Sequence, residues 1–139
     1  MISFNYETDF ELDNENRLSN WIATVIETEG FKYEDINYIF CNDDYLHKIN
    51  VEFLNHDTLT DIISFDYSVG KILQGDIYIS VDRVRDNAID FKQQFDDELY
   101  RVMVHGVLHY CGYKDKSEEE ATQMRDKENE YLELLKQID

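Results

Sequence analysis

The chain has 139 residues, a net charge of -18, no proline and only five glycines. This length suits one ordinary domain, and no repeat or glycine-rich linker divides the chain, so we expect a single domain over residues 1–139. The excess of acid disfavours a protein that binds free nucleic acid through a basic surface, because phosphate binding normally depends on clustered lysine and arginine.

Hydrophobic periodicity predicts a chain that alternates between strands and helices. In chain order, the expected elements are a strand at 2–6, a helix at 18–28, a strand at 33–42, a helix directly after it, strands at 61–67 and 76–81, and helices at 81–93, at 96–110 and after 117. The sum is an α/β (α+β) fold, a small mixed β-sheet with helices packed around it.

Local signals set several helix ends. Gly30 is expected to close the first helix, Asp43 or Asp44 to cap the second, and Ser117 with Glu120 to form a capping box on the last. The apolar positions expected to face inward in the first, third and last helices are Leu18, Trp21, Ile22, Val25 and Ile26, then Val84, Ala88 and Phe91, then Ala121, Met124, Tyr131, Leu132 and Leu135.

The exported and membrane classes are not expected. No apolar run reaches the length of a membrane span, and the first residues lack the basic and apolar leader of a secreted protein. We therefore expect a cytoplasmic protein in which Cys41 and Cys111 stay reduced.

The most informative motif lies in and after the helix predicted at 96–110. His105 and His109 are four residues apart, so both imidazoles leave the same helix face. Gly112 can end the helix in a left-handed conformation, and the chain can then turn back to bring Asp115 towards the histidines. Two nitrogens and one carboxylate suit zinc with one position open, so this is a zincin-like metal helix.

Two alternatives bear on this site. Asp115 can instead cap the last helix or bond a turn amide, with water, Cys111 or a neighbouring side chain completing the ligand set. Cys111 is the weaker choice, because it points about 200° away from His109 around the helix. Gly106 stands where zinc peptidases carry the glutamate that activates water, which disfavours peptide hydrolysis.

Two blocks resemble the YbeY-type rRNA maturation factors, metal-dependent endoribonucleases of bacteria. Residues 105–115 read HGVLHYCGYKD beside the family's HGxLHxxGYDH, and residues 60–65 and 75–80 read TDIISF and GDIYIS beside TDVLSF and GDIxIS. The resemblance implies cleavage of single-stranded rRNA precursor, in 16S rRNA 3′-end maturation and ribosome quality control. It implies one zinc ion, or another divalent transition metal, held by catalytic residues His105, His109 and Asp115.

The resemblance also implies partners, and the chain departs from the family's pattern at two positions. The partners are rRNA and the small ribosomal subunit or an assembly protein, with neither DNA nor a membrane. Asp115 replaces the family's third histidine, and Leu54 stands where the family carries an arginine thought to serve the active site. A non-catalytic ribosome-assembly factor with a structural metal is therefore a rival function, and a zinc metallopeptidase is a weaker one.

Five further residues are candidates for contacts with substrate. The resemblance points to Asp61 and Ser64, although capping at a strand start and a polar sheet edge explain them equally well. Arg83, Arg85 and Arg101 can contact phosphate or pair with the abundant acids nearby.

Overall fold

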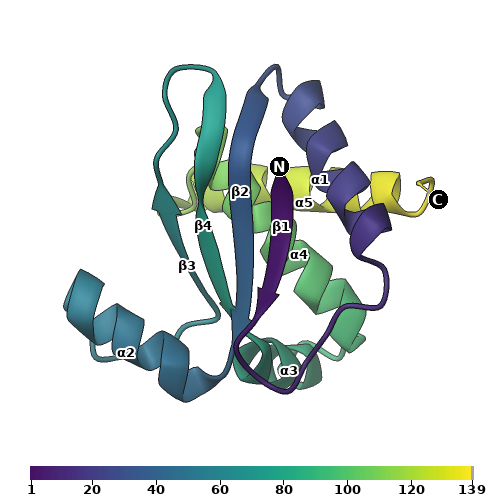
Figure 1. Cartoon of the computed structure of the whole chain (residues 1–139). Coiled ribbons are helices and arrows are strands. Elements are labelled where there is room, and N and C mark those ends of the chain that lie inside the picture. Colours follow the sequence, from purple (N-terminus) through teal and green to yellow (C-terminus); the bar gives the residue numbers. More distant parts are fainter. Residues whose placement is uncertain (139) are drawn as a thin grey trace.

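The computed structural model describes residues 1–138 and confirms the mixed sheet with packed helices (Figure 1). Its elements, in chain order, are β1 (Ile2–Tyr6), α1 (Glu15–Thr28), β2 (Lys32–Cys41), α2 (Asp43–Leu54), β3 (Ile62–Asp66), β4 (Ile72–Ser80), α3 (Val81–Asp90), α4 (Phe95–Tyr110) and α5 (Glu118–Leu135). The strand order is β1-β2-β4-β3, in which β1, β2 and β4 are parallel and β3 is an antiparallel edge strand.

One face of the sheet carries the main core. Alternating residues of β2, namely Ile36, Tyr38 and Phe40, are fully buried against side chains of α1 and α4. In Figure 1, α4 and α5 lie behind the sheet, and α5 runs across the direction of the strands. Because strand side chains alternate between faces, one strand with this pattern can line a core on one side only.

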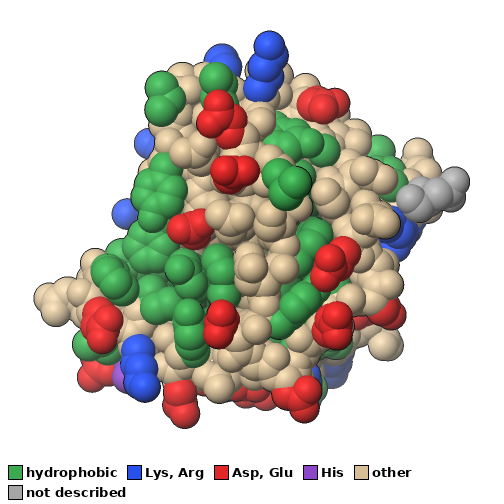
Figure 2. Space-filling view, viewed as in Figure 1, with side chains coloured by type: hydrophobic (Ala, Val, Ile, Leu, Met, Phe, Trp, Pro, Cys, Tyr) green, Lys and Arg blue, Asp and Glu red, His purple; other side chains and the backbone are tan. Residues whose placement is uncertain are grey.

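The other face is covered only in part. A smaller cluster joins Cys41, Leu46 of α2 and Ile63 of β3. Figure 2 shows hydrophobic side chains gathered over α2 and β3, where Phe53 and Phe65 meet edge to face. Within residues 1–138, no helix combines the length and the apolar character needed to cross a bilayer.

Tyrosine hydroxyls anchor α4 beneath the sheet. The Tyr38 hydroxyl donates to the Met103 carbonyl over 2.8 Å, and the Tyr110 hydroxyl donates to the carbonyls of Phe65 (2.8 Å) and Asp76 (3.1 Å). These bonds satisfy buried polar groups at both elements, and they fix the helix that carries the two histidines relative to β2, β3 and β4.

Most sequence-based boundaries are confirmed, with corrections at helix ends. The five inward positions of α1 are all buried, and the Ser117 capping box forms as expected. The cap of α2 is Asn42 rather than Asp43 or Asp44, since the Asn42 side chain accepts from the Tyr45 amide. Strand β4 begins at Ile72, four residues before the predicted start.

Two inward positions are wrong. Ala121 is exposed in the first turn of α5, ahead of the part of the helix that packs on the core. Phe91 is exposed because α3 ends at Asp90, before the predicted Gln93. Lys92 takes a left-handed conformation with φ 56°, and Gln93 donates back to Ala88 over 2.8 Å, which turns the chain away from the helix axis.

Candidate metal centre

The turn after α4 has the geometry that the glycine predicts. Gly112 has φ 103°, a left-handed conformation that side chains rarely adopt. Its amide donates to His109 over 3.0 Å, and the Tyr113 amide donates to Leu108 over 3.1 Å, the two bonds of a Schellman motif. This closure reverses the chain directly after the second histidine, so Asp115 returns to the end of α4.

Three donor atoms converge at this point. His105 Nε2 and His109 Nε2 lie 2.9 Å apart, and Asp115 Oδ2 lies 3.1 Å from the first and 3.3 Å from the second. Zinc with bonds of about 2.0–2.1 Å in a tetrahedral site spaces neighbouring ligands by about 3.3 Å. The three donors therefore stand close to the spacing of one face of such a tetrahedron.

The outer nitrogens show which atoms are free to bind a cation. His109 Nδ1 lies 2.9 Å from the Tyr113 carbonyl, which only accepts hydrogen bonds, so Nδ1 carries the proton. His105 Nδ1 lies 2.7 Å from Glu128 Oε2 and donates to it. Both Nε2 atoms then present lone pairs towards a carboxylate oxygen. Three acceptors at this spacing repel one another unless a cation lies between them, so the donor set fits a metal ion.

The surrounding charges favour a cation as well. Burial alone would lower the pKa of His105, but the hydrogen bond to Glu128 and the charges of Glu128 and Asp115 raise it above its ordinary value. Burial would raise the pKa of Glu128, but hydrogen bonds from His105 and Arg101 lower it, so Glu128 is a carboxylate. The same negative field stabilises a divalent ion.

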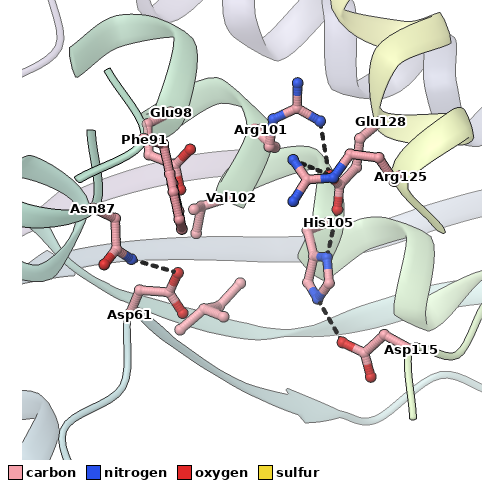
Figure 3. Close-up of a pocket in the computed structure, with 11 residues that line it drawn as sticks. Asp61, Asn87, Phe91, Glu98, Arg101, Val102, His105, Asp115, Arg125 and Glu128 are labelled. Atoms are coloured by element: carbon pink, nitrogen blue, oxygen red, sulfur yellow. Dashed lines mark hydrogen bonds and ion pairs between the residues drawn. The ribbon is translucent and has the colours of Figure 1, made fainter. Parts of the chain in front are cut away.

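A cavity of about 300 Å³ adjoins His105 (Figure 3). Four acids line it together with two arginines and an exposed phenylalanine: Asp61, Glu98, Asp115, Glu128, Arg101, Arg125 and Phe91. Burial is the largest cause that raises the pKa values of Asp61 and Glu98. Hydrogen bonds and the charge of His105 lower the pKa of Asp61 to a smaller extent, and the charges near Glu98 act on its pKa in both directions. The site is therefore a pocket beside the converging donors rather than a flat surface.

Gly106 packs against the sheet. A Cβ atom there would lie 3.1 Å from Ile62 Cδ1 and 3.2 Å from Ile77 Cδ1 and Cγ2. A side chain at this position would press on the contact between α4 and the strands, and Gly106 leaves the site without the glutamate that serves as the base in a zinc peptidase.

The arginine candidates divide between surface ion pairs and a buried support. Arg83 bonds Asp43, and Arg85 pairs with Asp82, both away from the cavity. Arg101 lines the cavity, and its Nη1 bonds Glu128 over 2.9 Å. Leu54 is exposed at the end of α2 and does not line the cavity.

The remaining candidates are placed as follows. Asp61 lines the cavity, whereas Ser64 does not. Cys111 is half-buried and lies outside the converging group. His56 is exposed, and His47 is partly buried and lies 2.7 Å from Asp57; neither histidine belongs to the converging group.

Sequence reasoning missed two supporting residues. Glu128 holds His105, and the Tyr113 carbonyl holds His109. Glu128 had a readable signal, because it is an acid within the buried stripe of α5 formed by Met124, Tyr131 and Leu135. The Tyr113 contact uses a main-chain atom, so no side-chain pattern indicates it.

Known proteins resemble this chain over nearly its whole length. The family model described as Endoribonuclease YbeY matches residues 2–136. A protein named Endoribonuclease YbeY from Flavobacterium johnsoniae is 61% identical over 135 residues, covering 97% of each chain. One of the same name from Christiangramia forsetii is 56% identical over 134 residues, covering 96% of this chain and 94% of the relative.

A solved structure shares the fold. The solution structure of a Thermotoga maritima protein aligns with a TM-score of 0.69 and 25% identity, covering 97% of this chain and 89% of that one. The match of the family model over nearly the whole sequence, together with relatives of this identity, shows that the chain belongs to the YbeY endoribonuclease family.

Proposed function

We propose that the protein is a zinc-dependent endoribonuclease that cleaves single-stranded rRNA precursor in 16S rRNA 3′-end maturation and ribosome quality control. The observation that carries the proposal is the convergence of His105 Nε2, His109 Nε2 and Asp115 Oδ2 within 3.3 Å of one another. The names of its relatives, Endoribonuclease YbeY, supply the RNA substrate.

The three ligands leave one side of the metal position free for substrate. His105, His109 and Asp115 would hold the zinc ion, which would supply Lewis acidity towards the charge that develops on the scissile phosphate. His105 and His109 are held in one tautomer by Glu128 and the Tyr113 carbonyl, so their Nε2 atoms face the ion without rearrangement. Asp115 adds a negative charge that makes the ion a slightly weaker Lewis acid than a third imidazole would.

The charge of the chain shapes the expected behaviour towards RNA. With a net charge of -18, the chain repels phosphate at long range, so binding to free RNA is weak. Its sensitivity to salt comes from the local contacts between phosphate and the few cationic groups at the site. The small ribosomal subunit or an assembly protein is the partner that would deliver the substrate, at a cytoplasmic location.

The test is cleavage of a pre-16S rRNA fragment by the purified, zinc-loaded protein. Wild type should cut the fragment and His109→Ala should not, while His56→Ala, at an exposed loop residue, should remain active. Equal activity in wild type and His109→Ala would contradict the proposal.

One observation favours a second function. Leu54 stands where the resemblance implies an arginine, so a phosphate contact from that position would have to come from another cation. A ribosome-assembly factor with a structural metal would bind the small subunit and lose its fold without zinc, yet leave the rRNA fragment intact.

A further inference from the structure

The cavity beside His105 has two chemically different ends. Figure 3 shows Phe91, Asn87 and Asp61 on one side and His105 and Asp115 on the other. The first end is aromatic and acidic, and the second adjoins the metal ligands. Such a gradient suits a ligand that is planar and rich in hydrogen-bond donors at one end and anionic at the other.

Phe91 forms the aromatic wall. The end of α3 leaves its side chain 57% exposed over the cavity, although a phenylalanine usually gains stability from burial. Ile89, two residues earlier, is exposed as well but does not line the cavity. An exposed ring beside a polar cavity offers a flat face on which an unpaired base can stack.

Asn87 and Asp61 supply polar groups next to that ring. Asn87 Nδ2 donates to Asp61 Oδ2 over 3.3 Å, the long end of the hydrogen-bond range. The amide oxygen of Asn87 remains as an acceptor, and the Asp61 carboxylate, which also accepts from main-chain amides of residues 61 and 62, keeps further lone pairs. Acceptors of this kind bond the amino groups of cytosine, adenine or guanine, so the edge of a base can be held here.

Arg125 is the cation available at the other end. Arg101 is 14% exposed and is already bonded to Glu128 (2.9 Å) and Asn129 (2.8 Å). Arg125 is 56% exposed, and its guanidinium lies 3.7 Å from Glu128, beyond hydrogen-bond distance. Its side chain can therefore move to a phosphate without breaking a short bond.

We propose that this cavity is a subsite for one unpaired nucleotide of the RNA, with its base on Phe91, its base edge at Asn87 and Asp61, and its phosphate at Arg125. The inference rests on the proposed function, because it takes single-stranded RNA as the substrate. The volume of the cavity, about 300 Å³, lies at the lower end of the range for small-molecule sites, which suits a single nucleoside. The aromatic ring of Phe91 lies at one end of the cavity and the guanidinium of Arg125 at the other, and this separation sets the orientation of the nucleotide.

The experiment measures binding of a fluorescent, 2′-O-methylated single-stranded RNA hexamer to the zinc-loaded protein at low salt. Phe91→Leu keeps an apolar side chain but removes the ring, and it should weaken binding about 5- to 100-fold. Ile89→Ala, on α3 and away from the cavity, is the control and should bind within twofold of wild type. Zinc content should be equal in all three proteins.

A set of hexamers with one abasic residue each separates base from phosphate contacts. At one position of the hexamer, the missing base should weaken binding to the wild-type protein. The same abasic hexamer should bind Phe91→Leu as well as the intact hexamer does. Arg125→Gln should weaken every hexamer alike and reduce the salt slope by about one phosphate contact, whereas Arg85→Gln on α3 should not. Wild-type affinity in Phe91→Leu, or an abasic effect that persists in it, would overturn the subsite.

The two proposals fail in distinguishable ways. If the wild-type protein binds the hexamer through Phe91 yet leaves the pre-16S fragment uncut, endonuclease function is refuted and the subsite stands. If cleavage depends on His109 but Phe91→Leu binds and cleaves as wild type does, the subsite is refuted alone.

Discussion

Glu128 is the buried acid on which the geometry of the first histidine depends. Its side chain is 6% exposed and lies 2.7 Å from His105, 2.9 Å from Arg101 and 3.7 Å from Arg125. Glu128→Gln keeps the size and one acceptor oxygen but removes the charge. It should lower zinc affinity about 10- to 100-fold, or about 1.4–2.7 kcal/mol, since partners that orient a ligating histidine carry energies of this size.

The same change acts on the fold through Arg101. Loss of a buried ionic partner costs about 3–5 kcal/mol of stability. Because Arg101 keeps its hydrogen bond to Asn129, we expect the free energy of unfolding to fall by about 3 kcal/mol or less. Zinc affinity is measured by competition with a chromophoric chelator, and stability by urea unfolding of the metal-free protein. Glu133→Gln on the exposed side of α5 is the control, with a partner in Lys136. Zinc affinity within twofold of wild type in Glu128→Gln would refute the supporting role.

Three further changes test the fold around the site. Gly75→Ala should cost about 1–3 kcal/mol in urea unfolding, because the new Cβ would lie 2.3 Å from a main-chain oxygen of β3; wild-type stability would contradict this contact. Gly112→Ala should cost about 1–2 kcal/mol of stability because of its φ of 103°, and it should also weaken zinc binding. Gly30→Ala, at φ 87° but remote from the ligands, should lose stability alone. Equal zinc affinity in the two variants would contradict this expectation. Burial would raise the pKa of Glu29, but hydrogen bonds, first from Tyr131, lower it below its ordinary 4.5. The ionised Glu29 therefore stabilises the fold above pH 4.5, and this stabilisation is lost as the pH falls through the pKa that Glu29 has in the folded protein. Glu29→Gln should therefore be less stable than wild type at pH 7, and the difference in thermal denaturation should shrink in acid; a constant difference would contradict the assignment.

Much of the fold was predictable because periodicity and local capping agree with the tertiary contacts. In α1 the apolar stripe from Leu18 to Ile26 is the face that packs, and Gly30 ends the helix as its conformational freedom indicates. The cap of α2 was misassigned because Asn42, Asp43 and Asp44 are all good capping residues, and only the backbone decides which side chain reaches the Tyr45 amide.

The site shows a similar division. Spacing alone indicated that His105, His109 and Asp115 can meet, because helix geometry and a glycine turn fix their directions. The end of α3 was not predictable, since it depends on Lys92 taking a left-handed conformation that glycine usually supplies. That ending exposes Phe91 over the cavity, a placement that no apolar periodicity describes.

The most direct test of the account is a crystal structure of the zinc-loaded protein with anomalous data collected on both sides of the zinc absorption edge. We expect one zinc peak per chain, within about 2.0–2.2 Å of His105 Nε2, His109 Nε2 and an Asp115 carboxylate oxygen. A peak bound elsewhere, or three unchanged side chains with no zinc between them, would contradict the claim on which the proposed chemistry depends.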